Sequence, residues 1–226
     1  NGNVDLYAVV FNRTTETDLT EDQLPQVDIY KYKQVIFVGD SRTEFMENVL
    51  TGMGESATKN VKFVCSAGKG LDWFTTTGWA QLYSIVQHDS NSILSKKTAV
   101  IFNFGVNDLS KSADYAEYYN WIAPQLKSKG CELYFMSVNP VNRLMLPNAG
   151  RADRSEAAVR SFNQYMKANL SSAYTYIDMY SYLKSTGYSF ASDHYGTGTV
   201  DDGLHYTTRT YKRIFAKCMD SLRVPA

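Results

Sequence analysis

The chain has 226 residues, of which 44% are hydrophobic and 20% are charged, as expected for one medium-sized globular domain. Lys and Arg together number 23, as do Asp and Glu, so no net charge favours nucleic acid or an anionic membrane. No apolar run approaches the roughly 18–20 residues that span a bilayer. We therefore expect no nucleic-acid partner and no membrane span.

Five apolar runs of strand length follow one another along the chain, at 34–39, 61–66, 98–105, 132–138 and 174–180. They are continuously apolar rather than alternating, which is typical of strands buried on both faces. Amphipathic stretches predict helices around 43–51, 72–88, 112–129, 152–170 and 207–222. Alternating strands and helices indicate an α/β protein whose parallel sheet has helices on both faces.

These elements leave no obvious linker and no internal repeat, so we predict one domain over residues 31–226. Residues 1–30 are harder to place, and we expect them to form an N-terminal extension that packs on this domain. The segment shows no charged-then-apolar signal pattern. A composition rich in Asn, Ser, Thr and Tyr leans towards a secreted or cell-envelope protein.

The first predicted strand ends in Gly39, Asp40, Ser41 and Arg42. Open α/β sheets bind their ligands beyond the carboxyl ends of the strands, which makes this position a candidate site. Taken alone, Ser41 is better explained as the N-cap of the following helix than as a nucleophile. A catalytic serine needs a base within hydrogen-bond reach, and the usual base is histidine.

Only three histidines are present, so the candidate bases can be compared one by one. His88 lies near the end of a predicted helix, and His194 lies in a glycine-rich loop. His205 follows Asp202 by three residues, a spacing that allows the carboxylate to reach Nδ1 and leave Nε2 free as a base. Asp201 is the rival orienting residue, at a less suitable spacing.

Acyl transfer also needs donors for the negative charge that develops on the substrate carbonyl oxygen. The backbone N–H of Ser41 at a helix start, the backbone N–H of Gly70 and the side-chain amide of Asn107 are candidates. Each also has an ordinary explanation, because glycine and asparagine are common turn residues.

Four blocks occur in one order: "GDS" after the first strand, a glycine after the second, "GVND" after the third and "DGLH" before the last helix. Together they resemble the SGNH hydrolase family of lipases and esterases, also called GDSL, from about Val35 to the final helix. The resemblance implies a three-layer α/β/α sandwich that is flavodoxin-like, with a parallel five-stranded sheet. It also implies catalysis without a metal or organic cofactor.

By the same resemblance, Ser41 would be the nucleophile, His205 the general base and Asp202 its orienting acid. The oxyanion hole would consist of the Ser41 amide, Gly70 and Asn107, with Gly68 as the fallback for Gly70. The family often has Leu where this chain has a charged residue after the serine, so the first block departs from the usual pattern at a position that is not catalytic in the family.

Four residues near the strand ends are candidate substrate contacts: Asp40, Arg42, Trp73 and Asn139. An aromatic ring at Trp73 would stack on a sugar or line an acyl pocket, although core packing explains such a residue equally well. No wide apolar lid segment is present, so we expect a short acyl ester, with acetyl on a carbohydrate favoured. Two alternatives remain open at this stage: an O-acyltransferase that uses the same triad, and a non-catalytic carbohydrate-binding module.

Metal sites are not predicted. The three cysteines, Cys65, Cys131 and Cys218, are far apart and form no C-x-x-C pair, so neither a zinc site nor a disulfide framework is indicated. The acidic, glycine-rich segment 193–203 lacks the EF-hand spacing ending in Glu, so it is interpreted as an ordinary loop.

Overall fold

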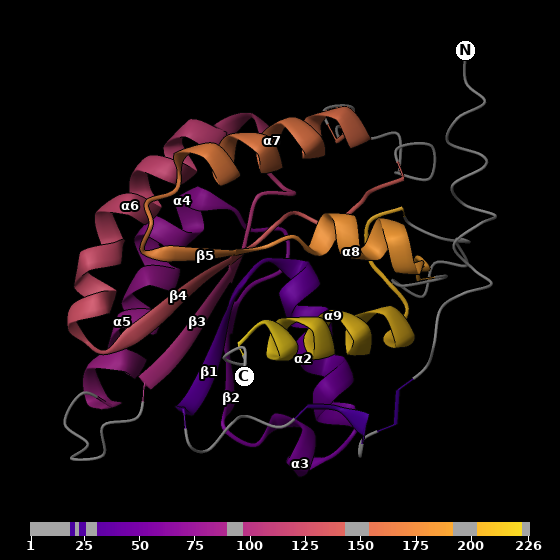
Figure 1. Ribbon diagram of the computed structural model, residues 1–226, viewed down its shortest axis with the longest axis horizontal. Coiled ribbons are helices and arrows are strands. Elements are labelled where there is room, and N and C mark those ends of the chain that lie inside the picture. The colour runs from indigo at the N-terminus through magenta and orange to yellow at the C-terminus, as the bar shows by residue number, and fades with distance from the viewer. Residues whose placement is uncertain are drawn as a thin grey trace.

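The computed structural model describes residues 19–20, 23–25, 31–89, 97–142, 154–191 and 203–222. Its strands are β1 (Tyr32–Gly39), β2 (Val61–Cys65), β3 (Lys97–Asn103), β4 (Cys131–Met136) and β5 (Tyr174–Ile177). All neighbours pair in parallel, in the order β2-β1-β3-β4-β5 (Figure 1). This is the flavodoxin-like doubly wound order, and it confirms the predicted fold class.

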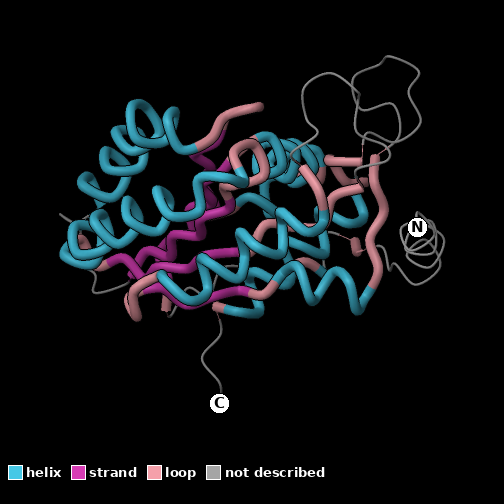
Figure 2. The backbone as a smooth tube through the Cα atoms, turned by 90° about the horizontal axis from the view of Figure 1, so that it is seen from above, coloured by secondary structure: helices cyan, strands magenta, loops and turns pink. Residues whose placement is uncertain are grey.

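Helices cover both faces of the sheet (Figures 1 and 2). One face carries α4 (Leu71–Trp73), the π-helical turn η2 (Phe74–Gly78), α5 (Trp79–Asp89), α6 (Ser112–Ser128) and α7 (Glu156–Asn169). The other carries α2 (Ser41–Gly52), the short α3 (Glu55–Thr58), α8 (Met179–Thr186) and α9 (Thr208–Ser221). A 3₁₀ turn, η3 (Leu109–Lys111), leads into α6.

Strand β1 shows why its apolar run is continuous. Ile36 and Val38 belong to the core beneath α4–α7, whereas Val35 and Phe37 belong to the core beneath α2, α8 and α9. All four side chains are fully buried. Successive strand residues point to opposite faces, so a strand between two helical layers needs apolar residues at every position.

The predicted strand at 174–180 is too long. Strand β5 ends at Ile177, because the Asp178 carboxylate accepts a hydrogen bond from the Ser181 amide and caps α8. The pattern also failed to predict α3 and α8 as helices. In the N-terminal extension, Leu24 is 3% exposed and packs in the core beneath α2; most of residues 1–30 lie outside the described residues.

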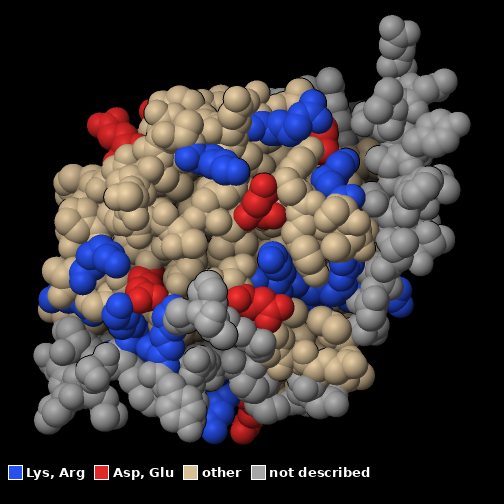
Figure 3. Space-filling model, viewed as in Figure 1, with Lys and Arg blue, Asp and Glu red and all other residues tan. Residues whose placement is uncertain are grey.

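The described surface carries no feature that changes the expectations about partners. Lys and Arg are interspersed with Asp and Glu on the face shown in Figure 3. Among the described helices, none has the length and apolar character required to cross a membrane. The same residues contain no group of three or more His, Cys, Asp or Glu side chains suited to a metal ion.

Candidate active site

The carboxyl ends of β1, β2 and β3 lie side by side, with Gly39 in register with Cys65 and Asn103. A Cβ atom on Gly39 would lie 2.0 Å from Oγ1 of Thr43 in the first turn of α2. Glycine is therefore needed here because the helix begins directly against the end of the strand. This close approach places the start of α2 at the ligand-binding edge of the sheet.

Asp40, rather than Ser41, is the N-cap of α2. Its carboxylate accepts a hydrogen bond of 3.0 Å from the Arg42 amide, and its side chain is 1% exposed. Burial raises the pKa of Asp40 to about 6, although the Arg42 amide and the charges of Arg42 and Arg154 act in the opposite direction. This enclosed position does not support the expected contact between Asp40 and a substrate. Because Asp40 caps α2, Ser41 is not needed as the cap.

Ser41 lies next to His205. The Oγ atom of Ser41 is 2.8 Å from Nε2 of His205, although the two residues are 164 positions apart in sequence. Both side chains are buried, and the Phe45 ring packs against the imidazole at an interplanar angle of 73°, with ring centroids 4.7 Å apart. This separation is within the range that a serine and its general base require.

The segment that carries His205 is held from two sides. The backbone carbonyl of His205 accepts a hydrogen bond from the Ala191 amide at 2.8 Å, and Tyr206 forms an antiparallel bridge with Phe190. The preceding Gly203 carbonyl accepts from the Asn142 amide, also at 2.8 Å. The loop after β4 and the segment after α8 therefore support the histidine together.

Arg42 joins these segments to the helix that carries Ser41. Its Nε donates to the Leu204 carbonyl, Nη1 to the Asn139 carbonyl and Nη2 to the Pro140 carbonyl, each at 2.9 Å. The side chain is 2% exposed. With these three donors directed at backbone oxygens, the guanidinium is suited to fixing the loops around Ser41 and not to the substrate contact that we expected.

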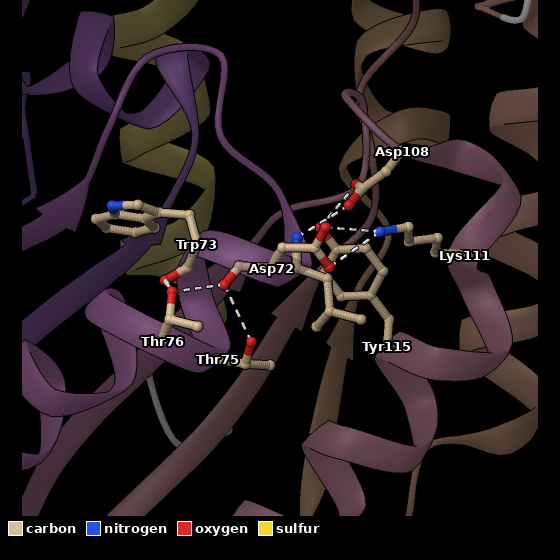
Figure 4. Close-up of polar contacts among 8 residues, drawn as sticks. Asp72, Trp73, Thr75, Thr76, Asp108, Lys111 and Tyr115 are labelled. Carbon is tan, nitrogen blue, oxygen red and sulfur yellow. Dashed lines mark hydrogen bonds and ion pairs between the residues drawn. The ribbon is translucent and has the colours of Figure 1, made fainter.

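Gly70 lies at the start of α4, where Asp108 approaches it closely. The Asp108 carboxylate accepts from the Leu71 amide at 2.9 Å and from the Tyr115 hydroxyl at 2.8 Å (Figure 4). A Cβ on Gly70 would lie 2.3 Å from Oδ2 of Asp108. Only glycine fits here, and no acceptor among the described residues takes the Gly70 amide proton.

Asp108 thus caps α4 from the loop after β3. Burial raises the pKa of its carboxyl above the ordinary value, while the hydrogen bonds from Leu71 and Tyr115 act in the opposite direction. The fallback candidate Gly68 differs from Gly70: it has φ +71° and open space around it, as a turn glycine does.

Asn107 joins the same two loops. Its Nδ2 donates to the Lys69 carbonyl at 2.7 Å, and its Oδ1 accepts from Nη2 of Arg154. Arg154 itself is 5% exposed. The carbonyl that holds Asn107 belongs to the residue before Gly70, so the structure brings two of the expected oxyanion donors into one connected set.

Asn139 and Trp73 have different surroundings. The Asn139 side chain is 1% exposed, and neither its oxygen nor its nitrogen has a hydrogen-bond partner among the described residues. The Trp73 ring packs against Phe104 and over Gly78, on the side of the helix away from Asp108 (Figure 4). Core packing accounts for Trp73, whereas Asn139 stays a candidate substrate contact.

Among the histidines that the structure describes, His205 is the one that lies beside Ser41. His88 is exposed on α5, where its Nδ1 is 2.6 Å from the Ser84 carbonyl of the same helix. His194, Asp201 and Asp202 lie outside the described residues. The role of Asp202 as the orienting acid therefore stays a prediction.

The GDSL-like lipase/acylhydrolase family model matches residues 35–218, from β1 to within α9. The chain belongs to this family. The match covers β1 from Val35 onward, all of β2 to β5, and both segments that carry Ser41 and His205. No curated protein matches the sequence.

Solved structures with a similar fold include three proteins whose chains are covered almost completely. A protein of Bacteroides fragilis proposed to be an acylhydrolase has a TM-score of 0.57 at 16% identity, covering 97% of this chain and 96% of its own. An acetyl xylan esterase has a TM-score of 0.54 at 12% identity, covering 84% and 100%. A protein of Slackia heliotrinireducens proposed to be an SGNH hydrolase has a TM-score of 0.54 at 12% identity, covering 85% and 100%.

Three features of this GDSL family member were not identified from the sequence: the tether formed by Arg42, the cap formed by Asp108, and Arg154 beside Asn107. The clash between a Cβ on Gly70 and Asp108 links the second and third sequence blocks, but no sequence spacing indicates such a contact. Arg154 lies in the long connection between β4 and α7, outside the four sequence blocks.

Proposed function

We propose that this GDSL family member is a serine esterase that hydrolyses short acyl esters, with acetyl on a carbohydrate as the expected substrate. The observation that carries the proposal is the 2.8 Å separation between Oγ of Ser41 and Nε2 of His205 in a buried setting. A serine hydroxyl becomes an effective nucleophile when a neighbouring imidazole accepts its proton.

In the proposed reaction, Ser41 Oγ attacks the ester carbonyl carbon while Nε2 of His205 takes the hydroxyl proton. The carbonyl oxygen becomes an oxyanion held by the amides of Ser41 and Gly70 and by the side chain of Asn107. Collapse of the tetrahedral intermediate expels the alcohol, which receives the proton from His205, and leaves an acyl-Ser41. His205 then activates a water that releases the acid and regenerates Ser41.

Two features support oxyanion stabilisation at this place. Ser41 is the first residue of α2, so its amide lies at the positive end of the helix dipole. The Gly70 amide has no acceptor among the described residues, and it belongs to the loop that is bonded to Asn107. Asp202 would orient Nδ1 of His205, as the sequence resemblance implies.

The burial of the nucleophile supports a short acyl group. Ser41 is 5% exposed and His205 is 1% exposed, with the Phe45 ring against the imidazole. An acetyl group needs little room beside a serine this enclosed. An acetyl xylan esterase has the same fold, which is compatible with an acetylated carbohydrate as the substrate.

The test compares hydrolysis of 4-nitrophenyl acetate, butyrate and octanoate by the wild type, Ser41→Ala and the control Ser185→Ala. Ser185 is exposed on α8, and its hydroxyl donates to the Tyr182 carbonyl of the same helix. We expect acetate to be the best substrate, Ser41→Ala to be inactive and Ser185→Ala to match the wild type. Release of acetate from an acetylated xylo-oligosaccharide then tests the carbohydrate part.

Labelling with a fluorophosphonate, followed by intact-mass measurement, provides a test that does not depend on the choice of ester. One adduct on the wild type and none on Ser41→Ala is the expected result. A wild type that neither hydrolyses any ester nor forms the adduct would refute the proposed serine chemistry. Transfer of acetyl to an added sugar hydroxyl in place of water would instead indicate an acyltransferase.

A further inference from the structure

Arg154 occupies a buried position beside a residue of the proposed oxyanion hole. It lies just before Ser155, the N-cap of α7, and its side chain is 5% exposed. Its Nη2 donates a hydrogen bond to Oδ1 of Asn107, which lies 47 positions earlier in the chain. Burying a charged guanidinium is costly, and hydrogen bonds such as the one to Asn107 offset part of that cost.

The two contacts of Asn107 define the orientation of its amide group. A carboxamide has one acceptor oxygen and two N–H donors, whereas a guanidinium can only donate. Rotating the amide by 180° would place its N–H groups against the Arg154 donors and its oxygen against the Lys69 carbonyl. Both hydrogen bonds would then become repulsive contacts between like groups.

In the observed orientation, one Nδ2 hydrogen is donated to the Lys69 carbonyl at 2.7 Å. The second hydrogen has no acceptor among the described residues. Asn107 therefore has one N–H available for a ligand. A cationic donor on Oδ1 also polarises the amide and strengthens its N–H groups as donors.

We propose that Arg154 is a positioning residue that fixes the Asn107 amide so that its second N–H faces the oxyanion of the substrate. This inference rests on the proposed function. Lys69 immediately precedes Gly70, so the hydrogen bond from Asn107 to the Lys69 carbonyl links the two proposed oxyanion donors, Asn107 and Gly70. Arg154, which lies just before α7, holds the other side of the Asn107 amide through its hydrogen bond to Oδ1.

The charge of Arg154 also acts on Asp40, the residue before the proposed nucleophile. The positive charge of Arg154 acts to lower the pKa of Asp40, which places the guanidinium within electrostatic reach of the residue before Ser41. Arg154 therefore lies near both the nucleophile side and the oxyanion side of the site.

The test is a double-mutant cycle of Arg154→Met and Asn107→Ala, measured with 4-nitrophenyl acetate and normalised to the active sites titrated by a fluorophosphonate. We expect Asn107→Ala to lower kcat by about 10²–10³-fold, as the loss of one oxyanion donor does. Arg154→Met should lower kcat by about 10- to 10²-fold with little change in KM, because a misplaced group costs up to about 10²-fold.

The double variant should be no slower than Asn107→Ala alone, because Arg154 acts through Asn107. Arg154→Lys keeps the charge but loses the planar fork, and should recover only part of the rate. Arg160→Met, which removes an exposed arginine from α7, serves as the control for loss of charge. The rate of Ser41 phosphonylation gives a second readout that needs no ester.

The inference is overturned if Arg154→Met reacts at the wild-type rate, or if it slows the Asn107→Ala variant by the same factor as the wild type. A change in KM alone would also overturn it and would indicate direct contact with the substrate. In each of these cases the Ser41 adduct still forms, and the proposed function survives. A wild type without that adduct would refute the proposed function and the inference together.

Discussion

Replacing Gly70 with alanine tests the contact that links the second and third sequence blocks. The added Cβ would lie 2.3 Å from Oδ2, 2.7 Å from Cγ and 2.9 Å from Oδ1 of Asp108. Ordinary packing distances are about 3.5 Å, so the carboxylate or the start of α4 must move by about 1 Å. The side chain cannot yield freely, because Leu71 and Tyr115 hold both of its oxygens.

The expected cost follows from these contacts. Overpacking costs about 1–3 kcal/mol, and weakening a hydrogen bond to a charged group costs about 1.5–3 kcal/mol. We expect Gly70→Ala to lower the free energy of unfolding by about 2–4 kcal/mol, and Tm by roughly 5–15 °C for a domain of this size. If the Gly70 amide is an oxyanion donor, kcat should fall by about 10²–10³-fold as well.

Differential scanning calorimetry and the 4-nitrophenyl acetate assay measure the two effects, with two glycines as controls. Gly52→Ala has open space in α2 and should be neutral or stabilising by about 0.4–1 kcal/mol. Gly68→Ala should cost about 1–2 kcal/mol because its φ is +71°, with kcat unchanged. A Gly70→Ala protein with wild-type Tm and kcat would show that this contact is not as tight as the structure has it.

Two further predictions concern the residues on either side of Ser41. Arg42→Met should lower the free energy of unfolding by about 3–5 kcal/mol, because it leaves the buried carbonyls of Leu204, Asn139 and Pro140 without their charged donor; calorimetry that shows a wild-type Tm would contradict the tether. Asp40→Asn retains the cap but removes a buried carboxylate whose pKa burial raises from 3.8 to about 6. Such a group binds its proton more tightly in the folded state, so its ionisation reduces stability as pH rises from about 4 to 6. At about 1.4 kcal/mol per pKa unit, the variant should gain on the order of 3 kcal/mol over the wild type at pH 7.5 and little at pH 4. An equal difference in Tm at both pH values would refute this account of Asp40.

Much of the fold could be predicted from local patterns. The apolar runs identified every strand of the sheet, because strands between two helical layers must be apolar at each position. The end of β5 was placed too late, since "IDMY" continues the apolar character of the strand while Asp178 starts a helix there. The short α3 has four residues, too few for a helical period to be recognised.

The candidate site was predictable in part. The order of the blocks indicated Ser41 and His205 as partners, and their atoms lie 2.8 Å apart. The same reasoning assigned Asp40 and Arg42 to the substrate, but both are buried and bonded to the protein. In a sequence, a charged residue next to a nucleophile suggests a substrate contact, because the sequence does not show whether groups of the protein already bind its charge.

The sequence by itself determined the class of fold, the family and the chemical character of the residues at the strand ends. These depend on hydrophobic period and on the order of short motifs, which are local properties of the chain. Only the tertiary structure decided which side chains serve the loops and which are left for a ligand. Arg42 bonds to carbonyls about 100 and 162 residues away, and Arg154 bonds to Asn107 across 47 residues. Such contacts form where the loops after β3 and β4 and the segment before α9 pack against one another. The spacing of residues along the chain does not predict which side chains come into contact there.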